Sequence, residues 1–346
     1  MAKIGIVGDV HLSRYSSILR SRGKNFSTRL EGLIKSLSWV EKLFEEHNCV
    51  EEIFLGDTFD TPDVDAETIT ALSEVDWNKS SKVRHFIVGN HESGISSLQY
   101  NSTQMLYKLG VIENVSRIYS IDDSCEILFL PYITEDNRKP LSEYLTKRDV
   151  NKDLIICSHN DIKGFQLGKF ISTTGFDVDE IEKNCNLYFN GHLHNCGNVT
   201  NKIINIGVLS GMNFNEDAFK YNHHVAIYDT ETKKIEYFEN PHAFNFYKIE
   251  INNEKDINKI STLKTNAVVS FRCLDKYKEL LIKALEQQNN IISHKITFIR
   301  EITSNESQNE STFDLGEDHL EQFRKYIIET LGNNNVVNEE LGEVCK

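Results

Sequence analysis

The chain has 346 residues, of which 39% are hydrophobic and 26% charged, and this composition fits a soluble globular protein that buries a core. Its length corresponds to about two domains, and the absence of any run of about 18 apolar residues excludes a membrane-spanning helix. The net charge of −14 argues against a general nucleic-acid binder, although bound divalent cations and local basic patches can override this mean.

The N-terminal segment and the cysteines both indicate a cytoplasmic protein. The first apolar run is too short for a signal peptide and leads directly into a Gly-Asp turn. The seven cysteines are scattered and include no CxxC pair, so neither a disulfide framework nor a zinc knot is indicated. We therefore expect the chain to stay in the cytoplasm.

Short apolar runs alternate with helical stretches over the first 240 residues. An amphipathic helix is predicted at residues 30–46. Such alternation indicates an α/β sheet, in which ligands bind at the carboxyl ends of the strands. The predicted strands are residues 3–8, 52–55, 84–88, 153–157 and 186–189.

Each of these five strands is followed by side chains that can bind a metal ion. The clusters read Asp-x-His, Gly-Asp, Gly-Asn-His, Ser-His and Gly-His-x-His. Any one of them alone also fits a turn or a surface strand, but their order after successive strands indicates one common site. Gly56 and Gly89 precede two of the clusters, where a glycine allows a sharp turn and a close approach of phosphate.

The residue types in these clusters indicate two transition-metal ions. Carboxylate, amide and imidazole donors together favour Mn²⁺, Fe or Zn²⁺ over Ca²⁺. Seven ligands exceed one tetrahedral site and fit two ions roughly 3.5–4 Å apart that share a carboxylate and clamp a phosphoester for hydrolysis. The predicted ligands are Asp9, His11, Asp57, Asn90, His159, His192 and His194.

The remaining third of the chain has a different pattern. Strands predicted at residues 244–251, 266–273 and 293–300 alternate with helices at residues 255–261 and 274–285, a βαβαβ order. A polar linker at residues 303–316 precedes a final helix at residues 318–331. We predict domains at residues 1–240 and 241–302, followed by a linker and partner-binding helix at residues 303–346.

The metal-site motifs resemble those of the calcineurin-like metallophosphoesterase family over roughly residues 3–230. The resemblance implies a β-sandwich flanked by helices. It also implies that one metal is held by Asp9, His11, Asp57 and His194, and the other by Asp57, Asn90, His159 and His192. By the same resemblance His91 contacts the phosphate and acts as a general acid or an orienting group.

Within that family the chain is similar to the nuclease subunit of the bacterial SbcC–SbcD complex and its phage counterparts. The similarity covers Asp9-Val10-His11-Leu12, Gly-Asp-x-Phe-Asp at residues 56–60, and residues 158–165 and 206–214. It implies a Mn²⁺-dependent DNA exo/endonuclease that works with an SbcC-type coiled-coil ATPase in DNA end processing, recombination or repair. Residues 241–302 would then be a capping domain, and a homodimer is left open.

Some residues depart from this subgroup and keep other functions open. Ser13 stands where glycine is usual, Asp60 where some archaeal members have histidine, and Glu92 where aspartate is usual. Gly-Asn-His-Glu is the form of protein phosphatases, so the alternative is a stand-alone metallophosphoesterase acting on nucleotides or phosphoproteins. The arginine that phosphatases carry after Gly-Asp-x-x-Asp is missing, which favours the nuclease. An inactive scaffold is the third hypothesis, which the full ligand set disfavours.

A basic stretch from Arg14 to Arg29 follows the first cluster directly. No acidic residue occurs between Asp9 and Glu31, an outlier in so acidic a chain. Such residues can grip phosphates beside the scissile bond, and Tyr15 or Phe26 can stack on unpaired bases. The other interpretation is a solvated loop with the start of a helix. The predicted DNA-binding residues are Arg14, Arg20, Arg22 and Lys24.

Overall fold

The computed structural model describes residues 2–16, 18–19, 21–77, 82–95, 97–109, 111–112, 118–167 and 170–300. Arg20, the predicted linker and the predicted final helix lie outside these described residues.

The first of two six-stranded sheets has the order β16-β15-β1-β2-β3-β6. Its strands β1, β2, β3 and β6 run parallel, and β15 and β16 extend it antiparallel beyond β1. The strands are β1 Lys3–Val7, β2 Glu51–Phe54, β3 Val83–Ile87, β6 Val111–Ile112, β15 His224–Asp229 and β16 Lys234–Glu239.

The second sheet has the order β13-β14-β12-β9-β8-β7, with a parallel centre and antiparallel edges. Its strands are β7 Tyr119–Ser120, β8 Cys125–Leu130, β9 Asp153–Ser158, β12 Leu187–Asn190, β13 Gly197–Asn198 and β14 Ile203–Asn205. Among them β9 and β12 match the strands predicted at residues 153–157 and 186–189.

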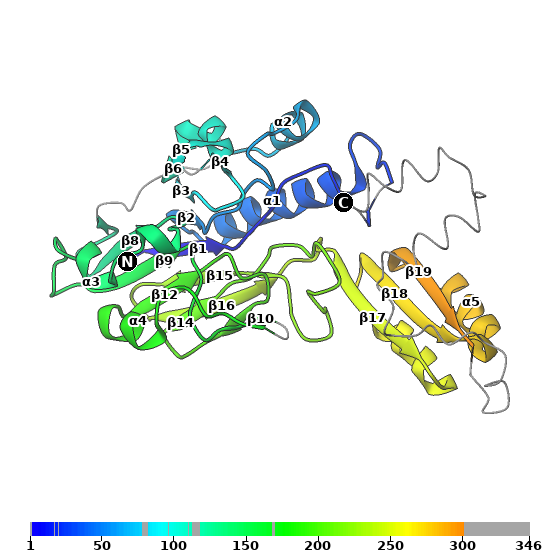
Figure 1. Cartoon of the computed structure of the whole chain (residues 1–346). Coiled ribbons are helices and arrows are strands. Elements are labelled where there is room, and N and C mark those ends of the chain that lie inside the picture. Colours follow the sequence, from blue (N-terminus) through cyan, green and yellow to red (C-terminus); the bar gives the residue numbers. More distant parts are fainter. Residues whose placement is uncertain are drawn as a thin grey trace, which may run out of the picture. The chain divides into compact units, whose positions relative to one another are not determined.

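The two sheets pack face to face and are covered by helices on their outer faces. Alternate residues of β1 and β2 such as Ile6 and Ile53 meet Phe129 and Phe189 of the second sheet in one apolar core. The opposite face of the first sheet packs against α1 (Thr28–Glu46), and that of the second against α3 (Leu141–Tyr144) and α4 (Val178–Asn184). The expected β-sandwich flanked by helices is confirmed (Figure 1).

Helix α1 begins two residues earlier than its apolar pattern predicts. The Ser27 hydroxyl accepts a hydrogen bond from the Leu30 N–H at 3.2 Å and caps the first turn. The residues Leu33, Leu37, Val40 and Phe44 form the buried stripe against the sheet, as their spacing predicts.

A small three-stranded parallel sheet follows, and Figure 1 shows its strands beside one another with α5 against them. The predicted βαβαβ order is present, although its first helical segment is a 3₁₀ helix and its second starts after Leu274, which ends a strand. The domain boundaries stay predictions. The elements are β17 Asn245–Ile251, η3 Glu254–Thr262, β18 Ala267–Leu274, η4 Asp275–Tyr277, α5 Lys278–Glu286 and β19 Ile291–Ile299.

Short elements complete the described chain, and none of its helices has the length and apolar character needed to cross a bilayer. These elements are α2 Ala66–Leu72, β4 Ser93–Ile95, β5 Ser97–Asn101, η1 Ser102–Leu109, η2 Glu135–Asn137, β10 Gln166–Leu167 and β11 Phe170–Ile171.

Candidate metal centre

The seven predicted ligands all lie at the carboxyl ends of the strands that were predicted to carry them. In the first sheet, Asp9 and His11 follow β1, Asp57 follows β2 and Asn90 follows β3. In the second sheet, His159 follows β9, and His192 and His194 follow β12. The sandwich therefore brings donor atoms from both sheets to one place.

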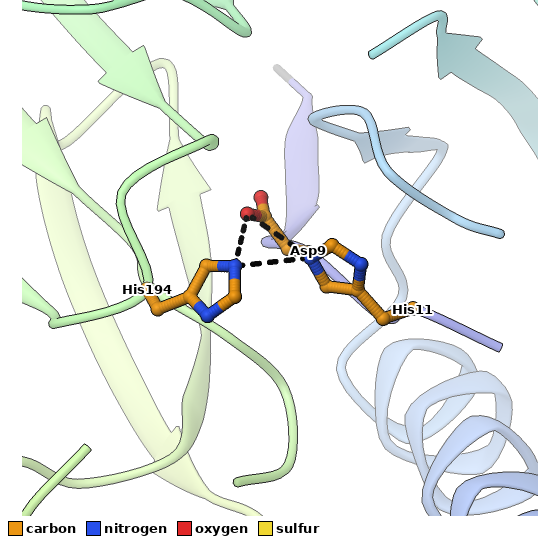
Figure 2. A group of neighbouring side chains, drawn as sticks. All are labelled: Asp9, His11 and His194. Atoms are coloured by element: carbon orange, nitrogen blue, oxygen red, sulfur yellow. Dashed lines mark hydrogen bonds and ion pairs between the residues drawn. The ribbon is translucent and has the colours of Figure 1, made fainter. Parts of the chain in front are cut away.

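Asp9, His11 and His194 form what we call the first donor group. The Nε2 atoms of the two histidines lie 3.1 Å apart and each is 3.9 Å from Oδ2 of Asp9. Figure 2 shows both rings turned toward the Asp9 carboxylate. Three donor atoms from two sheets thus face a common point.

Asp57, Asn90, His159 and His192 form the second donor group. His159 Nε2 lies 3.2 Å from Asp57 Oδ2 and 3.1 Å from Asn90 Oδ1, and His192 Nδ1 lies 2.9 Å from the same Asn90 oxygen. Asp57 Oδ2 is also 3.8 Å from His11 Nε2 of the first donor group. One carboxylate oxygen therefore faces both groups, as expected of a bridging ligand.

The electrostatics of both groups fit divalent cations. Oδ2 of Asp9 is buried and has no hydrogen-bond partner among the described residues, which is costly unless a cation compensates it. Burial alone would lower the pKa of His159, but the carboxylates of Asp57 and Asp9 raise it to about 9. Such a negative field and the mixed oxygen and imidazole donors suit two ions of the Mn²⁺, Fe or Zn²⁺ class. The first group with Asp57 would hold one ion, and the second group the other.

A partner fixes the second ring nitrogen of each histidine in the two groups. The Nδ1 atoms of His11, His159 and His194 lie 3.1, 2.7 and 2.7 Å from oxygens of Asp60, Leu55 and Glu216. His192 Nε2 lies 3.4 Å from Asp161 Oδ1. Partners of this kind orient metal-binding imidazoles and set which nitrogen faces the ion.

Glu216 has no signal in the sequence pattern, and the pattern leaves the role of Asp60 open. Glu216 is 22 positions beyond His194 in a polar loop without periodicity, so only its place after the segment at residues 206–214 could have suggested it. The pKa of its carboxyl is lowered, because the bond and charge of His194 outweigh burial. Burial would also raise the pKa of the Asp60 carboxyl, but the hydrogen bond and charge of His11 lower it.

Arg29 ends the predicted basic stretch, but it lies in the interior behind the site. Its side chain is buried, and its Nη2 donates a hydrogen bond of 3.1 Å to the backbone oxygen of His11. Burial lowers the pKa of this guanidinium, while the carboxylates of Asp60 and Glu216 act in the opposite direction. A fixed positive charge therefore supports the two carboxylates that orient histidines of the first donor group.

Three ligands adopt the left-handed backbone conformation. The φ angles are 50° at His11, 47° at Asp57 and 69° at His192. Non-glycine residues in this conformation cost about 1–3 kcal/mol each when strained, and they concentrate at functional sites. Gly56 precedes Asp57 with φ of 104°, and a Cβ atom there would lie 2.3 Å from His159 Nδ1. The predicted reason for this glycine, a sharp turn, is confirmed.

His91 lies at the solvent side of the two groups. Its backbone N–H donates to Asp57 Oδ1 at 3.0 Å, its ring Nδ1 lies 3.0 Å from the backbone oxygen of Asp60, and 44% of its side chain is exposed. Its ring meets that of His11 edge to face, with centroids 4.8 Å apart. This position suits a group that reaches a bound phosphoester from the open side.

Glu92 lies fully buried directly behind the site. Its two carboxyl oxygens accept hydrogen bonds from the N–H groups of Phe59, at 3.1 Å, and Gly89, at 2.8 Å. The side chain thereby joins the turns after β2 and β3. Burial and then the Asp57 charge raise its pKa to about 8, against the effect of the two N–H donors.

The raised pKa predicts a pH dependence of stability. In the unfolded chain Glu92 titrates near its ordinary value of 4.5, so unfolding between 4.5 and 8 releases a proton and is favoured by rising pH. The stabilising contribution is complete below this window and is lost as pH rises through it. The expected change is on the order of a few kcal/mol, at ~1.4 kcal/mol per pKa unit.

Urea unfolding of the metal-free protein at about pH 5 and about pH 8 tests this against Glu92→Gln, which cannot titrate. Wild type should lose more unfolding free energy than Glu92→Gln over this interval. Glu143→Gln, at an exposed carboxylate, is the control and should follow wild type. Parallel curves for Glu92→Gln and wild type would contradict the prediction.

Of the predicted DNA-binding residues, Arg14, Arg22 and Lys24 are described and reach the surface, and the two arginines lie next to α2. Arg14 approaches Asp65 and Glu67 at 3.4 and 3.5 Å, and Arg22 pairs with Glu67 at 3.1 Å. Lys24 is exposed. The arginines keep 38% and 64% of their side chains exposed, so their pairing with the acids is screened by solvent. Of the two aromatic residues in this stretch, Phe26 packs in the core and Tyr15 is 62% exposed.

Comparison with known proteins identifies one family and many similar solved structures, among them a phosphatase and a nucleotidase. The model of the calcineurin-like phosphoesterase family matches residues 2–196. A dimetal phosphatase from Danio rerio is 15% identical with a TM-score of 0.40, over 65% of this chain and 91% of that chain. The NAD nucleotidase of Haemophilus influenzae is 11% identical with a TM-score of 0.36, over 83% of this chain and 60% of that chain. No curated protein matches the chain significantly.

Proposed function

The chain belongs to the calcineurin-like phosphoesterase family, and on that basis we propose that it is a metal-dependent DNA nuclease subunit of the SbcD type. It hydrolyses phosphodiester bonds at DNA ends with two divalent ions, Mn²⁺ foremost. The observation that carries this proposal is the pair of donor groups that share Asp57 beside the exposed ring of His91.

Each part of this site has a place in phosphodiester hydrolysis. Two bound divalent ions supply Lewis-acid stabilisation of the charge that develops on a phosphoryl group. Asp57 would hold both ions, and the partners of the histidines fix the rings that hold them. His91 is not among the seven ligands and donates a proton to the leaving oxygen, which a histidine does readily near neutral pH.

The choice of DNA over a small phosphoester rests on the basic stretch. Arg14, Arg22 and Lys24 begin three residues beyond His11 and present exposed cations in an acidic chain. Phosphates of a DNA strand can replace Asp65 and Glu67 as partners of Arg14 and Arg22, because both arginine side chains reach solvent. Tyr15 offers an exposed ring for an unpaired base.

The partner in this proposal is an SbcC-type coiled-coil ATPase. The sequence predicts an apolar stripe on one face of the final helix, formed by Leu320, Phe323, Ile327 and Leu331. Burial of this stripe against a partner supports the proposal. The helix lies outside the described residues.

A cleavage assay with Mn²⁺, Mg²⁺ or Zn²⁺, with and without a candidate ATPase, tests the function. We expect Mn²⁺-stimulated degradation of DNA ends. Lys24→Glu should weaken DNA binding several-fold and leave hydrolysis of a small chromogenic diester unchanged. Lys42→Glu, at an exposed lysine near the C-terminal end of α1, is the control. Hydrolysis of nucleotides or phosphopeptides without any DNA cleavage would instead support the stand-alone phosphoesterase.

A further inference from the structure

The loop of residues 211–218 holds the carboxylate that orients His194. Glu216 is buried, and its Oε1 lies 2.7 Å from His194 Nδ1 and accepts a 3.0 Å hydrogen bond from the Asn213 side chain. Its Oε2 accepts from the backbone N–H groups of Met212 and Asn213. The loop thus wraps around the carboxylate, and a shift of the loop moves the carboxylate with it.

Both ends of this loop are hydrogen-bonded to the chain where β17 begins, one to the residue just before this edge strand of the three-stranded sheet and one to a residue within it. The Gly211 N–H donates to the backbone oxygen of Phe244 at 3.0 Å, and the Ala218 N–H donates to that of Phe246 at 2.9 Å. Between them the Phe214 ring meets the Phe246 ring edge to face, with centroids 5.3 Å apart. The loop is therefore attached to β17 on either side of Glu216.

The hydrogen bond to Glu216 determines whether His194 directs a free electron pair on Nε2 toward the other ligands of the first donor group. A neutral imidazole that donates its Nδ1 proton to a carboxylate keeps a free electron pair on Nε2. That Nε2 atom is the one 3.1 Å from His11 Nε2 and 3.9 Å from Asp9 Oδ2. A displaced Glu216 would rotate the ring or free its proton, and either change weakens ligation at this group alone.

We infer that Glu216 is a positioning residue that couples the first donor group to the three-stranded sheet through β17. A ligand or partner that displaces this sheet then changes metal affinity at the first donor group and leaves the second group unchanged. The inference rests on the proposed two-metal function and adds to it a route by which the sheet regulates the site.

Calorimetric titration of the metal-free full chain with Mn²⁺ tests the positioning role. Glu216→Gln should weaken one of two binding events about 10-fold to 100-fold, the usual effect of losing such a partner. Asp161→Asn is the matched control, because Asp161 faces His192 of the second group. The double variant Glu216→Gln/Asp161→Asn should weaken both events. Equal weakening of both events by Glu216→Gln alone would overturn the assignment.

The coupling is tested at Phe214, which is not in contact with any of the seven metal-binding residues. Phe214→Ala should weaken the same binding event about 2-fold to 30-fold, the range of mutations that alter coupling between sites. In the Glu216→Gln background it should have no further effect, because the route is already broken. Phe298→Ala is the control, since it removes a half-exposed ring from β19 on the same sheet.

The results distinguish a failure of the coupling from a failure of the proposed two-metal function. Wild type that binds fewer than two Mn²⁺ ions would overturn both. Wild type that binds two ions, with an additive effect of Phe214→Ala in the Glu216→Gln background, would overturn only the coupling. Circular dichroism of each variant monitors folding, and Phe214→Leu, which should give a smaller weakening, replaces Phe214→Ala if the latter unfolds.

Discussion

Replacing His91 by alanine should lower the rate of DNA cleavage by about 10²–10⁴-fold, the usual contribution of a general acid, while two metal ions remain bound. The ring is exposed and lies beside His11, but its backbone N–H rather than its side chain bonds to Asp57. Loss of the ring therefore leaves the carboxylates and histidines of both donor groups in place.

The leaving group distinguishes a proton donor from an orienting residue. A diester that releases a nitrophenolate needs no proton at its leaving oxygen, so His91→Ala should impair its hydrolysis far less than that of DNA. Equal losses on both substrates would show that His91 orients the phosphate. Metal analysis of the variant is the second readout, since the ring also lies near His11 and Asp57 in a cluster that could bind an ion. Loss of metal from His91→Ala would make it a ligand.

Asp57→Asn should remove both metal ions and with them at least about 10³-fold of activity, several kcal/mol of transition-state stabilisation. Its Oδ2 lies 3.8 Å from the histidine of one group and 3.2 Å from that of the other, so neither group is complete without it. His159 and then His11 and His91 hold the pKa of this carboxyl well below its usual range against the effect of burial. An amide cannot supply that charge.

Metal content per chain after dialysis, with cleavage rates, measures this effect. Asp60→Asn is the matched control, because Asp60 lies three residues further along the same turn and contacts only His11 among the ligands. The Asp60→Asn variant should still bind two ions, and its affinity for one of them should be lowered about 10-fold to 100-fold. If Asp57→Asn retained one ion at wild-type affinity, Asp57 would belong to a single group.

The ligand positions could be predicted because each follows a strand that its own apolar run defines. β1, β2 and β3 are parallel neighbours, so their carboxyl ends meet, and the residues after them gather without further information. The strands at residues 245–251, 267–274 and 291–299 were found for the same reason. A local pattern suffices where a local element carries the residue.

The surroundings of the ligands could not be predicted in this way. Glu216 and Arg29 act through contacts with residues 22 and 18 positions away, from a loop and from a helix whose charged residues give no sign of burial. The sequence pattern predicts that Arg29 belongs to an exposed basic stretch. A charged side chain is rarely buried unless partners from elsewhere in the fold compensate its charge. Those partners become visible only in three dimensions.

Each donor group combines ligands from both sheets, and this has a mechanical consequence. Asp9, His11, Asp57 and Asn90 belong to the first sheet, and His159, His192 and His194 to the second. Each metal ion would therefore tie the two layers of the sandwich together at one edge. Ligand binding of this kind adds about 2.7 kcal/mol of folding free energy for each ion at a hundredfold excess over its Kd. The ions needed for hydrolysis would thus also stabilise the packing of the two sheets. A chelator that removes them would lower the stability of the fold together with the activity.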